Sequence, residues 1–356
     1  MDAAALRAEF PALARLAYLN AGTDGPVPAA AVRAARAAVE AQAEEGRYGP
    51  HFEARFALLG ELRELYAEVL GAAAEDVALT TSTSEGVAAM LGGLDLGAGD
   101  EIVTSDSEHP GMVGPLLAAR ARGATIKPVP FRELADAVTA RTTLVACSHV
   151  SWVNGDIAPA ALAEVDVPVI LDGAQGAGAI DVDVRALGCA AYAASGQKWL
   201  CGADGTGMLY VEPGFRERVR VLDPSYISFE DANRGFESEL KPDARRFDAS
   251  AIAREVAAFS HASLSLLRHA GRAAVRERAA GLAATLAAEL AERGRTVAPR
   301  GDTTLVAWED PDAPGTAKRL AAAGVVVRDL PGRGLVRASV GAWNDESDLE
   351  RLLAAL

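Results

Sequence analysis

The sequence predicts an α/β fold in which short buried strands alternate with helices. Short apolar runs recur along the first two thirds of the chain, and residues that favour turns bound each of them. Longer Ala- and Leu-rich stretches with helical spacing separate many of these runs. Polar or Gly-rich segments follow several predicted strands, where open α/β sheets form their sites. These features are typical of a sheet that is covered by helices and carries a site at one edge.

The composition narrows the classes of function. The chain has 356 residues, 50% of them hydrophobic, which is enough for two domains and a large core. With 35 basic and 49 acidic residues, the net charge is −14. This charge argues against general nucleic-acid binding and against binding to an anionic membrane surface. Any anion site must therefore be local, built from particular arginines and backbone N–H groups.

Signals for targeting and for structural metals are missing. The first residues lack the basic start and the apolar core of a secretion signal. No run of about 18 uncharged apolar residues could span a bilayer. The three cysteines, Cys147, Cys189 and Cys201, lie in apolar settings without a C-x-x-C spacing. We therefore expect a reduced, cytoplasmic protein without disulfides, a metal site or a membrane span.

Helices are expected to dominate the first part of the chain, and strands the middle. Val167–Leu171 is short and apolar throughout, as expected for a strand buried on both faces, and Asp172 ends it. A further helix is expected from about Arg132, between two of the strands. The predicted helices of the first part are 2–9, 29–45 and 53–70, with a turn-rich loop at 20–28. The predicted strands are 77–80, 101–104, 124–128, 143–148, 167–171, 190–194 and 207–211.

The pattern changes after Pro213. Residues 222–250 hold few apolar side chains, and a polar loop of this length in a compact enzyme usually serves function or an interface. Two Ala-rich helices follow within 251–290, split near residue 271. The tail alternates strands at 303–308, 325–328 and 335–339 with helices at 315–323 and 345–355, the last capped by Asn344. We expect a large domain at 15–250 and a small α/β domain at 251–356, together with 1–14.

Lys198 is distinctive among the four lysines of the chain. It lies in S-G-Q-K-W-L-C-G-A-D-G-T-G, between the predicted strands 190–194 and 207–211. Burying an ammonium group is costly and usually lowers its pKa, so a lysine on a buried, Gly-rich loop usually has a function. Such a lysine can act as a nucleophile toward an aldehyde cofactor. The alternative is an ordinary loop lysine.

Two further segments fit a cofactor site. Asp172, at the end of its strand, can pair with a pyridinium nitrogen and keep it protonated, or it can cap a helix. Thr83 and Ser84 open the helix that follows strand 77–80, where hydroxyls and free N–H groups can bind a phosphate. A plain Ser/Thr cap, with Glu85 in the first turn, is the alternative there.

The segment D-G-A-Q at 172–175, followed by S-G-Q-K-W-L-C-G-A-D-G-T-G at 195–207, resembles the class V aminotransferase family of fold-type I pyridoxal-phosphate enzymes. That family includes cysteine desulfurases, cystine C–S lyases and isopenicillin N epimerase-like proteins. The resemblance extends over nearly the whole chain, because separated motifs occur in the family's order. It implies a mostly parallel seven-stranded sheet in the large domain, a small C-terminal α/β domain and pyridoxal 5′-phosphate as the cofactor.

The resemblance also assigns site residues. Lys198 would bind the cofactor and act as the base, and His109 would lie over the pyridine ring. The family often has a second histidine next, where this chain has Pro110. Arg337 of G-L-V-R-A-S would clamp the substrate α-carboxylate, and Asn20 would contact the substrate. The remaining cofactor contacts would come from Thr83, Ser84, Asn154, Asp172, Gln175, Ser195 and Gln197, and from Ser250, which would reach the neighbouring subunit's phosphate in a homodimer with shared active sites.

Other positions stay open between a functional and a structural role. The segment S-H-V-S-W-V-N-G is more similar to the C–S lyase branch than to the desulfurases. Its residues His149, Ser151 and Trp152 either line the pocket or only shape the turn. The residues Arg47, Tyr48 and His51 belong to a site, to a dimer surface or to a polar connection, and Cys201 is interpreted as a packing residue.

One departure from the family separates its branches. Desulfurases carry a nucleophilic cysteine shortly before the carboxylate-binding arginine, but V-V-V-R-D-L-P-G-R-G-L-V-R at 325–337 contains none. Arg328 and Arg333 occupy this segment and could bind a second, distal carboxylate. We therefore expect C–S bond cleavage by β-elimination from a cysteine-derived amino acid such as cystine or a cysteine conjugate. A class V aminotransferase or an isopenicillin N epimerase-like enzyme is the alternative, and a non-catalytic binding protein is a third.

Overall fold

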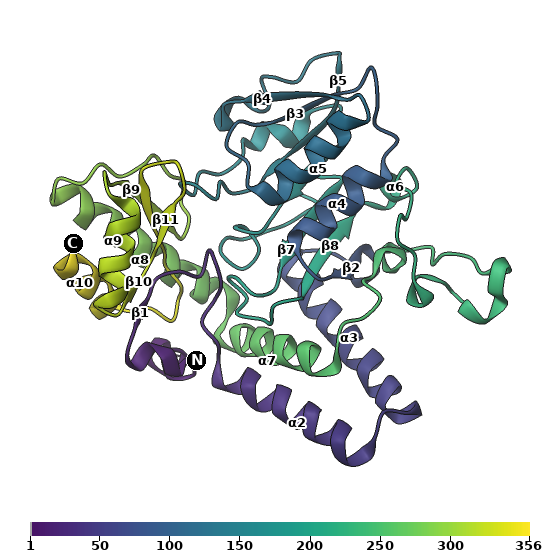
Figure 1. The fold of residues 1–356 in the computed structure, drawn as a ribbon, viewed down its shortest axis with the longest axis horizontal. Helices are drawn as coiled ribbons and strands as arrows, with labels where there is room; N and C mark the ends of the chain where they lie inside the picture. The colour runs from purple at the N-terminus through teal and green to yellow at the C-terminus, as the bar shows by residue number, and fades with distance from the viewer. Residues whose placement is uncertain (1) are drawn as a thin grey trace.

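A seven-stranded sheet lies at the centre of the larger part of the molecule in the computed structural model, which describes residues 2–356 (Figure 1). The strand order is β2-β8-β7-β6-β5-β3-β4, and β8 runs in the direction opposite to the other six strands. The strands are β2 (Val77–Thr80), β3 (Glu101–Ser105), β4 (Thr125–Val129), β5 (Thr142–Ser148), β6 (Val169–Asp172), β7 (Ala191–Ser195) and β8 (Gly207–Val211). The predicted mostly parallel α/β fold is confirmed.

Side chains that alternate across the strands build two cores, one on each face of the sheet. In β2, for example, Val77 belongs to one apolar cluster and Ala78 to the other. The first cluster is closed by α3 (Gly49–Leu70) and α7 (Arg254–Ala270), and the second by α4 (Thr83–Gly93) and α5 (Pro110–Ala121). Because helices cover both faces, the strands read as continuous apolar runs in the sequence.

Long helices border this sheet domain on one side (Figure 1). The helix α7 packs against both α2 (Ala29–Glu45) and α3. Between α6 (Pro213–Arg216) and α7, an irregular segment that contains short 3-10 turns extends away from the body of the molecule (Figure 1). None of the helices in residues 2–356 is both long and apolar enough to cross a membrane.

A smaller unit is built around a three-stranded antiparallel sheet with the order β11-β12-β9. Three helices, α8, α9 and α10, supply apolar side chains that pack on this sheet. The N-terminal segment joins the unit, because β1 (Ala17–Tyr18) pairs in parallel with β10 (Val325–Val326). The other elements are α1 (Ala3–Ala8), α8 (Arg272–Glu292), β9 (Leu305–Glu309), α9 (Ala313–Ala322), β11 (Arg328–Leu330), β12 (Leu335–Ser339) and α10 (Glu346–Ala355).

The helices on either side of Gly271 join different cores, while the expected domain boundary at residue 250 stays a prediction. The helix α7 contributes Ala257 and Leu264 to the core of the sheet domain, whereas α8 packs in the small unit. Gly271 separates the two helices with a φ of 91°, which residues with a side chain rarely adopt. Ala17, expected in the large domain, is part of the small unit's core.

Two local expectations differ from the structure. The helix expected from about Arg132 is only a 3-10 turn at Phe131–Glu133, because the short crossing from the edge strand β4 past β3 to β5 leaves little length for a helix. The cap of α10 is Asp345, whose carboxylate accepts a hydrogen bond from the Asp348 N–H at 3.3 Å. Asn344 instead accepts a hydrogen bond from the Gly341 N–H and closes the preceding turn.

Candidate active site

The carboxyl ends of the parallel strands open into a pocket that faces the small unit. Asp172 ends β6, Ser195 ends β7 and Lys198 follows, while Arg328 and Arg337 come from β11 and β12. The pocket has a volume of about 200 Å³. Its lining residues are Gly22, Thr23, Ser82, Thr83, Ser84, His109, Trp152, Asp172, Ala174, Gln175, Ser195, Gln197, Lys198, Arg328 and Arg337. The fold thus brings most of the predicted site residues together at the strand ends.

Contacts on both sides hold the loop that carries Lys198. On one side, the Gly25 N–H donates to the Gln197 carbonyl at 2.7 Å. Gly25 has no room for a side chain, because a Cβ there would lie 2.2 Å from the Lys198 carbonyl oxygen. On the other side, the Ser263 hydroxyl of α7 donates to the Cys201 carbonyl at 2.7 Å. The loop is therefore fixed between two neighbours, which preorganises its lysine.

Lys198 and Asp172 influence each other's ionisation. Burial lowers the pKa of Lys198 below its usual value, the Asp172 carboxylate opposes this shift and the Arg337 guanidinium adds to it. Burial raises the pKa of Asp172, and the charge of Lys198 opposes that shift. The Asp172 carboxylate also accepts a hydrogen bond from the Ala174 N–H at 2.9 Å. In this setting Lys198 gives up its proton more readily than a lysine in water.

His109 caps helix α5 with a defined tautomer. Its Nδ1 accepts a hydrogen bond from the Gly111 N–H at 3.1 Å, so the neutral ring carries its proton on Nε2. Burial lowers the pKa of His109 to about 4, and the neighbouring charges of Lys198 and Arg328 add to the shift. The imidazole at the pocket is therefore neutral at pH 7.

Hydroxyl groups without partners surround the amino end of α4. Within residues 2–356, the hydroxyls of Thr83 and Ser195 are buried and have no hydrogen-bond partner. Ser82, which directly precedes Thr83 and Ser84, caps the helix by accepting a hydrogen bond from the Glu85 N–H at 3.1 Å. A ligand with acceptor oxygens would remove the cost of the unpaired hydroxyls. The free N–H groups and the dipole at this helix end favour an anion there.

Arg337 is fully buried without a carboxylate partner. It is 0% exposed, its Nη1 donates to the Trp152 carbonyl, and its Nε and Nη2 have no partner in the part of the chain that the structure describes. Gly22 faces this group, since a Cβ there would lie 3.0 Å from Arg337 Nη2 and 2.7 Å from the Ser339 hydroxyl. Burial lowers the pKa of Arg337 to about 9, and Arg328 adds to the shift. A buried cation in this state favours binding of an anion.

Asn154, predicted to contact a cofactor ring, lies outside the pocket lining. Its amide donates a hydrogen bond to the Pro299 carbonyl of the small unit at 2.6 Å. Trp152, two residues earlier in the same turn, lines the pocket instead. This placement does not support the prediction for Asn154, because an irregular turn has no periodicity from which the inward-facing residue can be read.

Of three other predicted residues, Gln175 lies in the pocket lining, whereas Asn20 and Ser250 lie outside it. Gln175 lines the pocket with both ends of its amide engaged: Nε2 donates to the Gly22 carbonyl at 2.8 Å, and Oε1 accepts from the Trp199 indole at 3.1 Å. Asn20 is not among the lining residues and stands at the base of the loop that reaches the pocket at Gly22. Ser250 is exposed and borders a separate hollow on the surface.

His149 forms a buried pair with Tyr192 behind the pocket. Its Nδ1 lies 3.0 Å from the Tyr192 hydroxyl, and burial lowers the pKa of His149 to about 4. The unfolded chain protonates this histidine near pH 6.5. The stability that depends on neutral His149 is therefore complete above about pH 6.5 and is lost as the pH falls toward 4.

The low pKa of buried His149 predicts that the folded protein becomes less stable in acid. The free energy of unfolding should fall by up to about 3 kcal/mol between pH 7 and pH 4 because of His149. Urea unfolding at several pH values measures this loss, and His149→Gln should flatten the curve by that amount. The exposed His269 provides the control, since His269→Gln should leave the slope unchanged. An equal slope in wild type and His149→Gln would contradict the prediction.

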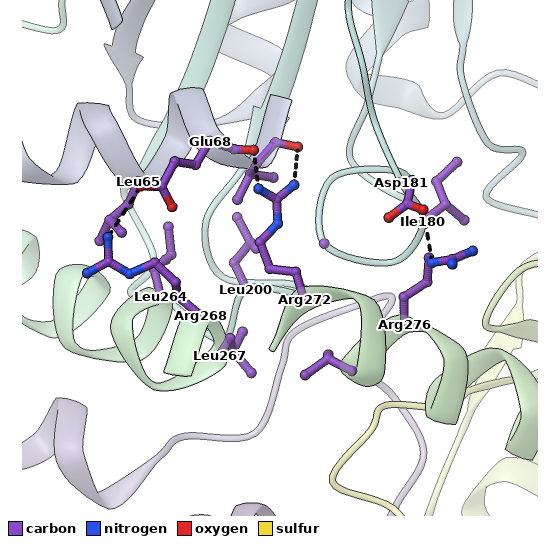
Figure 2. Close-up of a pocket in the computed structure, with 13 residues that line it drawn as sticks. Leu65, Glu68, Ile180, Asp181, Leu200, Leu264, Leu267, Arg268, Arg272 and Arg276 are labelled. Carbon is purple, nitrogen blue, oxygen red and sulfur yellow. Dashed lines mark hydrogen bonds and ion pairs between the residues drawn. The ribbon is translucent and has the colours of Figure 1, made fainter. Parts of the chain in front are cut away.

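A second pocket lies behind the Lys198 loop, between α3 and the junction of α7 with α8 (Figure 2). Leu200 of the Lys198 loop is one of its apolar walls. Its free volume of about 40 Å³ holds only a few water molecules and is too small for a substrate. Its three arginines are all engaged, Arg268 with Glu68, Arg272 with the carbonyls of Glu68 and Val69, and Arg276 with Asp181.

The chain matches one known protein family and is similar to curated proteins. The model of the family described as aminotransferase class-V matches residues 18–352. The chain is 32% identical to a probable cysteine desulfurase from Methanothermobacter thermautotrophicus, over 61% of this chain and 58% of that protein. It is 34% identical to isopenicillin N epimerase from Streptomyces clavuligerus, over 59% of this chain and 56% of that protein. The chain thus spans a little more than half the length of these curated relatives in the matched regions.

Solved structures extend the similarity over both units. The complex of the cystine C–S lyase C-DES with its reaction product cysteine persulfide has a TM-score of 0.91 and 25% sequence identity, covering 97% of this chain and 98% of that chain. A C-DES mutant with glycine covalently linked to its PLP cofactor has a TM-score of 0.92 at 25% identity, with 98% of each chain covered.

Proposed function

Since the chain belongs to the aminotransferase class-V family, we propose that it is a pyridoxal-phosphate enzyme that breaks the C–S bond of a cysteine-derived amino acid by β-elimination. The observation that carries this proposal is a single pocket in which Lys198 and Asp172 meet Arg337, a buried cation that has no carboxylate partner among the described residues. The similarity to a cystine C–S lyase over almost the whole chain supports the same reaction.

The residues present fit pyridoxal 5′-phosphate. When bound, this group supplies an aldehyde for the lysine amine and an electron sink for the electron pair at the substrate Cα. Lys198 would attach it, the Asp172 carboxylate would keep its ring nitrogen protonated, and neutral His109 would lie against the ring. The unpaired hydroxyls of Thr83 and Ser195, at the amino end of α4, would hold its phosphate.

Different side chains of this protein would carry out different steps of the elimination. Arg337 binds the substrate α-carboxylate through the guanidinium nitrogens that lack partners. The Lys198 amine, which burial makes easier to deprotonate, removes the proton from Cα and holds it at Nζ. The Cβ–S bond then breaks, and the sulfur leaves with the bonding electrons as a thiolate or persulfide. The three-carbon fragment, released as aminoacrylate, takes up water and yields pyruvate and ammonia.

The cysteines of this chain are poorly suited to take the sulfur. The segment between Val325 and Arg337 contains none. Cys147, Cys189 and Cys201 are free and buried, and burial raises the pKa of each thiol. A persulfide on the enzyme is therefore not part of the proposed reaction, and the sulfur departs on the leaving group, as the thiolate or persulfide. We also propose that the protein is cytoplasmic, because reduced thiols are typical of that compartment.

An end-point assay tests the reaction itself. The purified protein is offered cystine, cysteine and cysteine S-conjugates, and pyruvate and ammonia are measured. Pyruvate that forms without any keto-acid acceptor is the result expected of β-elimination. If none forms and the cofactor spectrum shifts to that of its amine form, transamination replaces elimination. Exchange of the Cα proton with inversion at Cα, again without pyruvate, would identify an epimerase.

Arg328 is expected to bind a second carboxylate at the far end of the substrate. It lies opposite Arg337 in the antiparallel pair of β11 and β12, so both side chains leave the sheet on the same face. Its Nη1 donates a long hydrogen bond of 3.4 Å to the Thr23 hydroxyl. Arg328→Met should raise the KM for cystine about 10- to 100-fold and change kcat less than about threefold, as measured by pyruvate formation.

Neighbouring and distant arginines serve as comparisons for this variant. Arg333→Met, from the exposed end of the same segment, should raise the KM by a smaller factor of about two to five. Arg319→Met, on the exposed face of α9, should leave both constants unchanged. Unchanged cystine kinetics in Arg328→Met would remove Arg328 from substrate binding.

We also propose that two copies of the chain share their active sites. Ser250 is exposed and lies outside the pocket of its own chain, so a partner copy can reach it. Large apolar side chains are exposed on α3 and on the extended segment: Phe52 and Phe56 at 45% and 41%, and Tyr226 and Phe236 at 53% and 112%. Of these, Phe56 and Tyr226 border a hollow together with Ala249, the residue before Ser250. Exposed apolar side chains of this kind often mark an interface.

Two substitutions at equally exposed positions test the proposed dimer. Phe52→Asp should shift the protein from dimer to monomer in light scattering and lower its activity at least about tenfold at micromolar concentration, because it buries a charge in the interface. Leu117→Asp, on α5, is the control, since Leu117 and Phe52 are both 45% exposed. A wild-type protein that is monomeric and fully active would rule out shared sites.

A further inference from the structure

Trp152 lies in a turn that both units hold in place. The turn follows β5, and the Ser151 N–H donates to the Asp156 carbonyl at 2.8 Å. Gly155, with a φ of 78°, lets the turn press against the small unit, since a Cβ there would lie 2.5 Å from the Thr303 hydroxyl. Trp152 itself is 9% exposed and lines the pocket. Its position therefore depends on both halves of the molecule.

The indole of Trp152 is fixed by contacts with three parts of the site. Its Nε1 donates to the Ser107 carbonyl at 2.8 Å. It meets the His109 ring edge-on, with ring centroids 5.3 Å apart and planes at 88°. The Arg333 guanidinium lies 5.4 Å from the ring centroid. The backbone carbonyl of Trp152 holds Arg337 Nη1, a contact that any residue at this position would keep.

We propose that the Trp152 indole is the wall against which the substituent on the substrate Cβ lies, so that it determines which leaving group the pocket accepts. This inference rests on the proposed elimination reaction and adds the basis of its selectivity. An indole face contacts a polarisable sulfur chain favourably. It cannot satisfy the hydrogen bonds of a hydroxyl or an amide, which would lose their water on binding. The cations Arg328, Arg333 and Arg337 disfavour a positively charged chain.

Two substrates with different substituents on Cβ are compared. The comparison separates a specific role of the indole from a general effect of the substitution on the site. Cystine carries the disulfide chain, whereas β-chloroalanine loses chloride and carries no chain. Trp152→Leu should lower kcat/KM for cystine about 10- to 30-fold, mainly through KM, and change kcat/KM for β-chloroalanine less than about threefold. Trp152→Phe keeps an aromatic face and should recover most of the cystine activity. Trp308→Phe, in the core of the small unit, should leave the ratio between the two substrates unchanged.

A binding measurement gives a second readout that does not require turnover. The probe is 2,7-diaminosuberate, the analogue of cystine in which methylene groups replace both sulfur atoms, titrated into the cofactor-loaded protein. Trp152→Leu should raise its Kd about 3- to 10-fold, because the chain loses its contact with the indole face. Cofactor content and melting temperature are measured on each variant, so that a damaged fold is recognised.

The possible outcomes separate this inference from the proposed reaction. If wild type forms no pyruvate but binding of diaminosuberate depends on Trp152, the lyase proposal fails, whereas the contact between the indole and the substituent on the substrate Cβ stands. If wild type forms pyruvate and Trp152→Leu changes neither the substrate ratio nor the Kd, the wall inference fails and the lyase proposal stands. An equal loss on cystine and β-chloroalanine would show that the indole only supports His109, which also overturns the inference.

Discussion

Replacing Lys198 with alanine is expected to abolish the reaction and to lower kcat about 10⁴-fold or more. Lys198 is proposed to attach the cofactor and to move the Cα proton, and each task alone is worth orders of magnitude in rate. The fold should survive, because contacts of Gly25 and Ser263 hold the loop and the ammonium group does not. Steady-state pyruvate formation measures the loss of activity, and the melting temperature reports on the fold.

A covalent readout separates attachment of the cofactor from catalysis. Reduction of the wild-type protein with borohydride should leave the mass of the cofactor on the peptide that contains Lys198, and mass spectrometry should find none in Lys198→Ala. Lys318→Ala, at an exposed position on α9, is the matched control and should behave as wild type in both measurements. Cofactor mass on Lys127 or Lys241 in the Lys198→Ala protein would place the attachment elsewhere and contradict the assignment.

Arg337→Met should lower kcat/KM about 10²- to 10³-fold for every substrate with an α-carboxylate and, at the same time, stabilise the cofactor-free protein. The loss reflects a buried, charge-assisted pair with the substrate, which is worth about 3–5 kcal/mol when one partner is removed. The gain arises because Arg337, 0% exposed, has two guanidinium nitrogens without a partner in residues 2–356. Methionine has a similar length and no charge, so urea unfolding should show a gain of about 1–3 kcal/mol.

Arg63, unlike Arg337, is a buried arginine with a carboxylate partner. It is 9% exposed and forms two hydrogen bonds with the Asp248 carboxylate, at 2.8 and 2.9 Å. Arg63→Met leaves Asp248 buried without this partner and should cost about 3–5 kcal/mol of stability. Opposite signs for the two variants would identify Arg337 as a residue kept for binding rather than for folding. If Arg337→Met destabilises the protein as strongly as Arg63→Met does, Arg337 is structural and its assignment to the carboxylate loses its basis.

Short stretches of sequence were enough to predict the framework of the site. The strands are recognisable because helices cover both faces of the sheet and leave continuous apolar runs. Lys198 and Asp172 could be assigned to the ends of buried strands, and parallel strands bring such ends to one edge. The family resemblance added His109 and Arg337, which the structure brings into the same pocket. Local patterns and strand direction therefore predicted the fold and the centre of the candidate site.

Only the tertiary structure decided the features that depend on contacts between distant parts of the chain. The turn after β5 has no periodicity, so the pattern could not distinguish Trp152, which lines the pocket, from Asn154, which bonds to Pro299. Amphipathic spacing shows that a helix has an apolar face but not which core it joins. Only the packing shows that α7 contributes to the core of the sheet domain and α8 to that of the small unit.

The two buried arginines show the same limit most clearly. Arg63 lies between Leu62 and Glu64, and Arg337 lies between Val336 and Ala338; neither setting tells which arginine is paired. Asp248 lies 185 residues from Arg63 along the chain, and only the packing of α3 beside the segment that precedes α7 brings them together. The sequence, through the family resemblance, therefore indicated Arg337 as a carboxylate ligand. Only the three-dimensional packing decided that Arg63 is paired with Asp248 while two guanidinium nitrogens of Arg337 have no partner in residues 2–356.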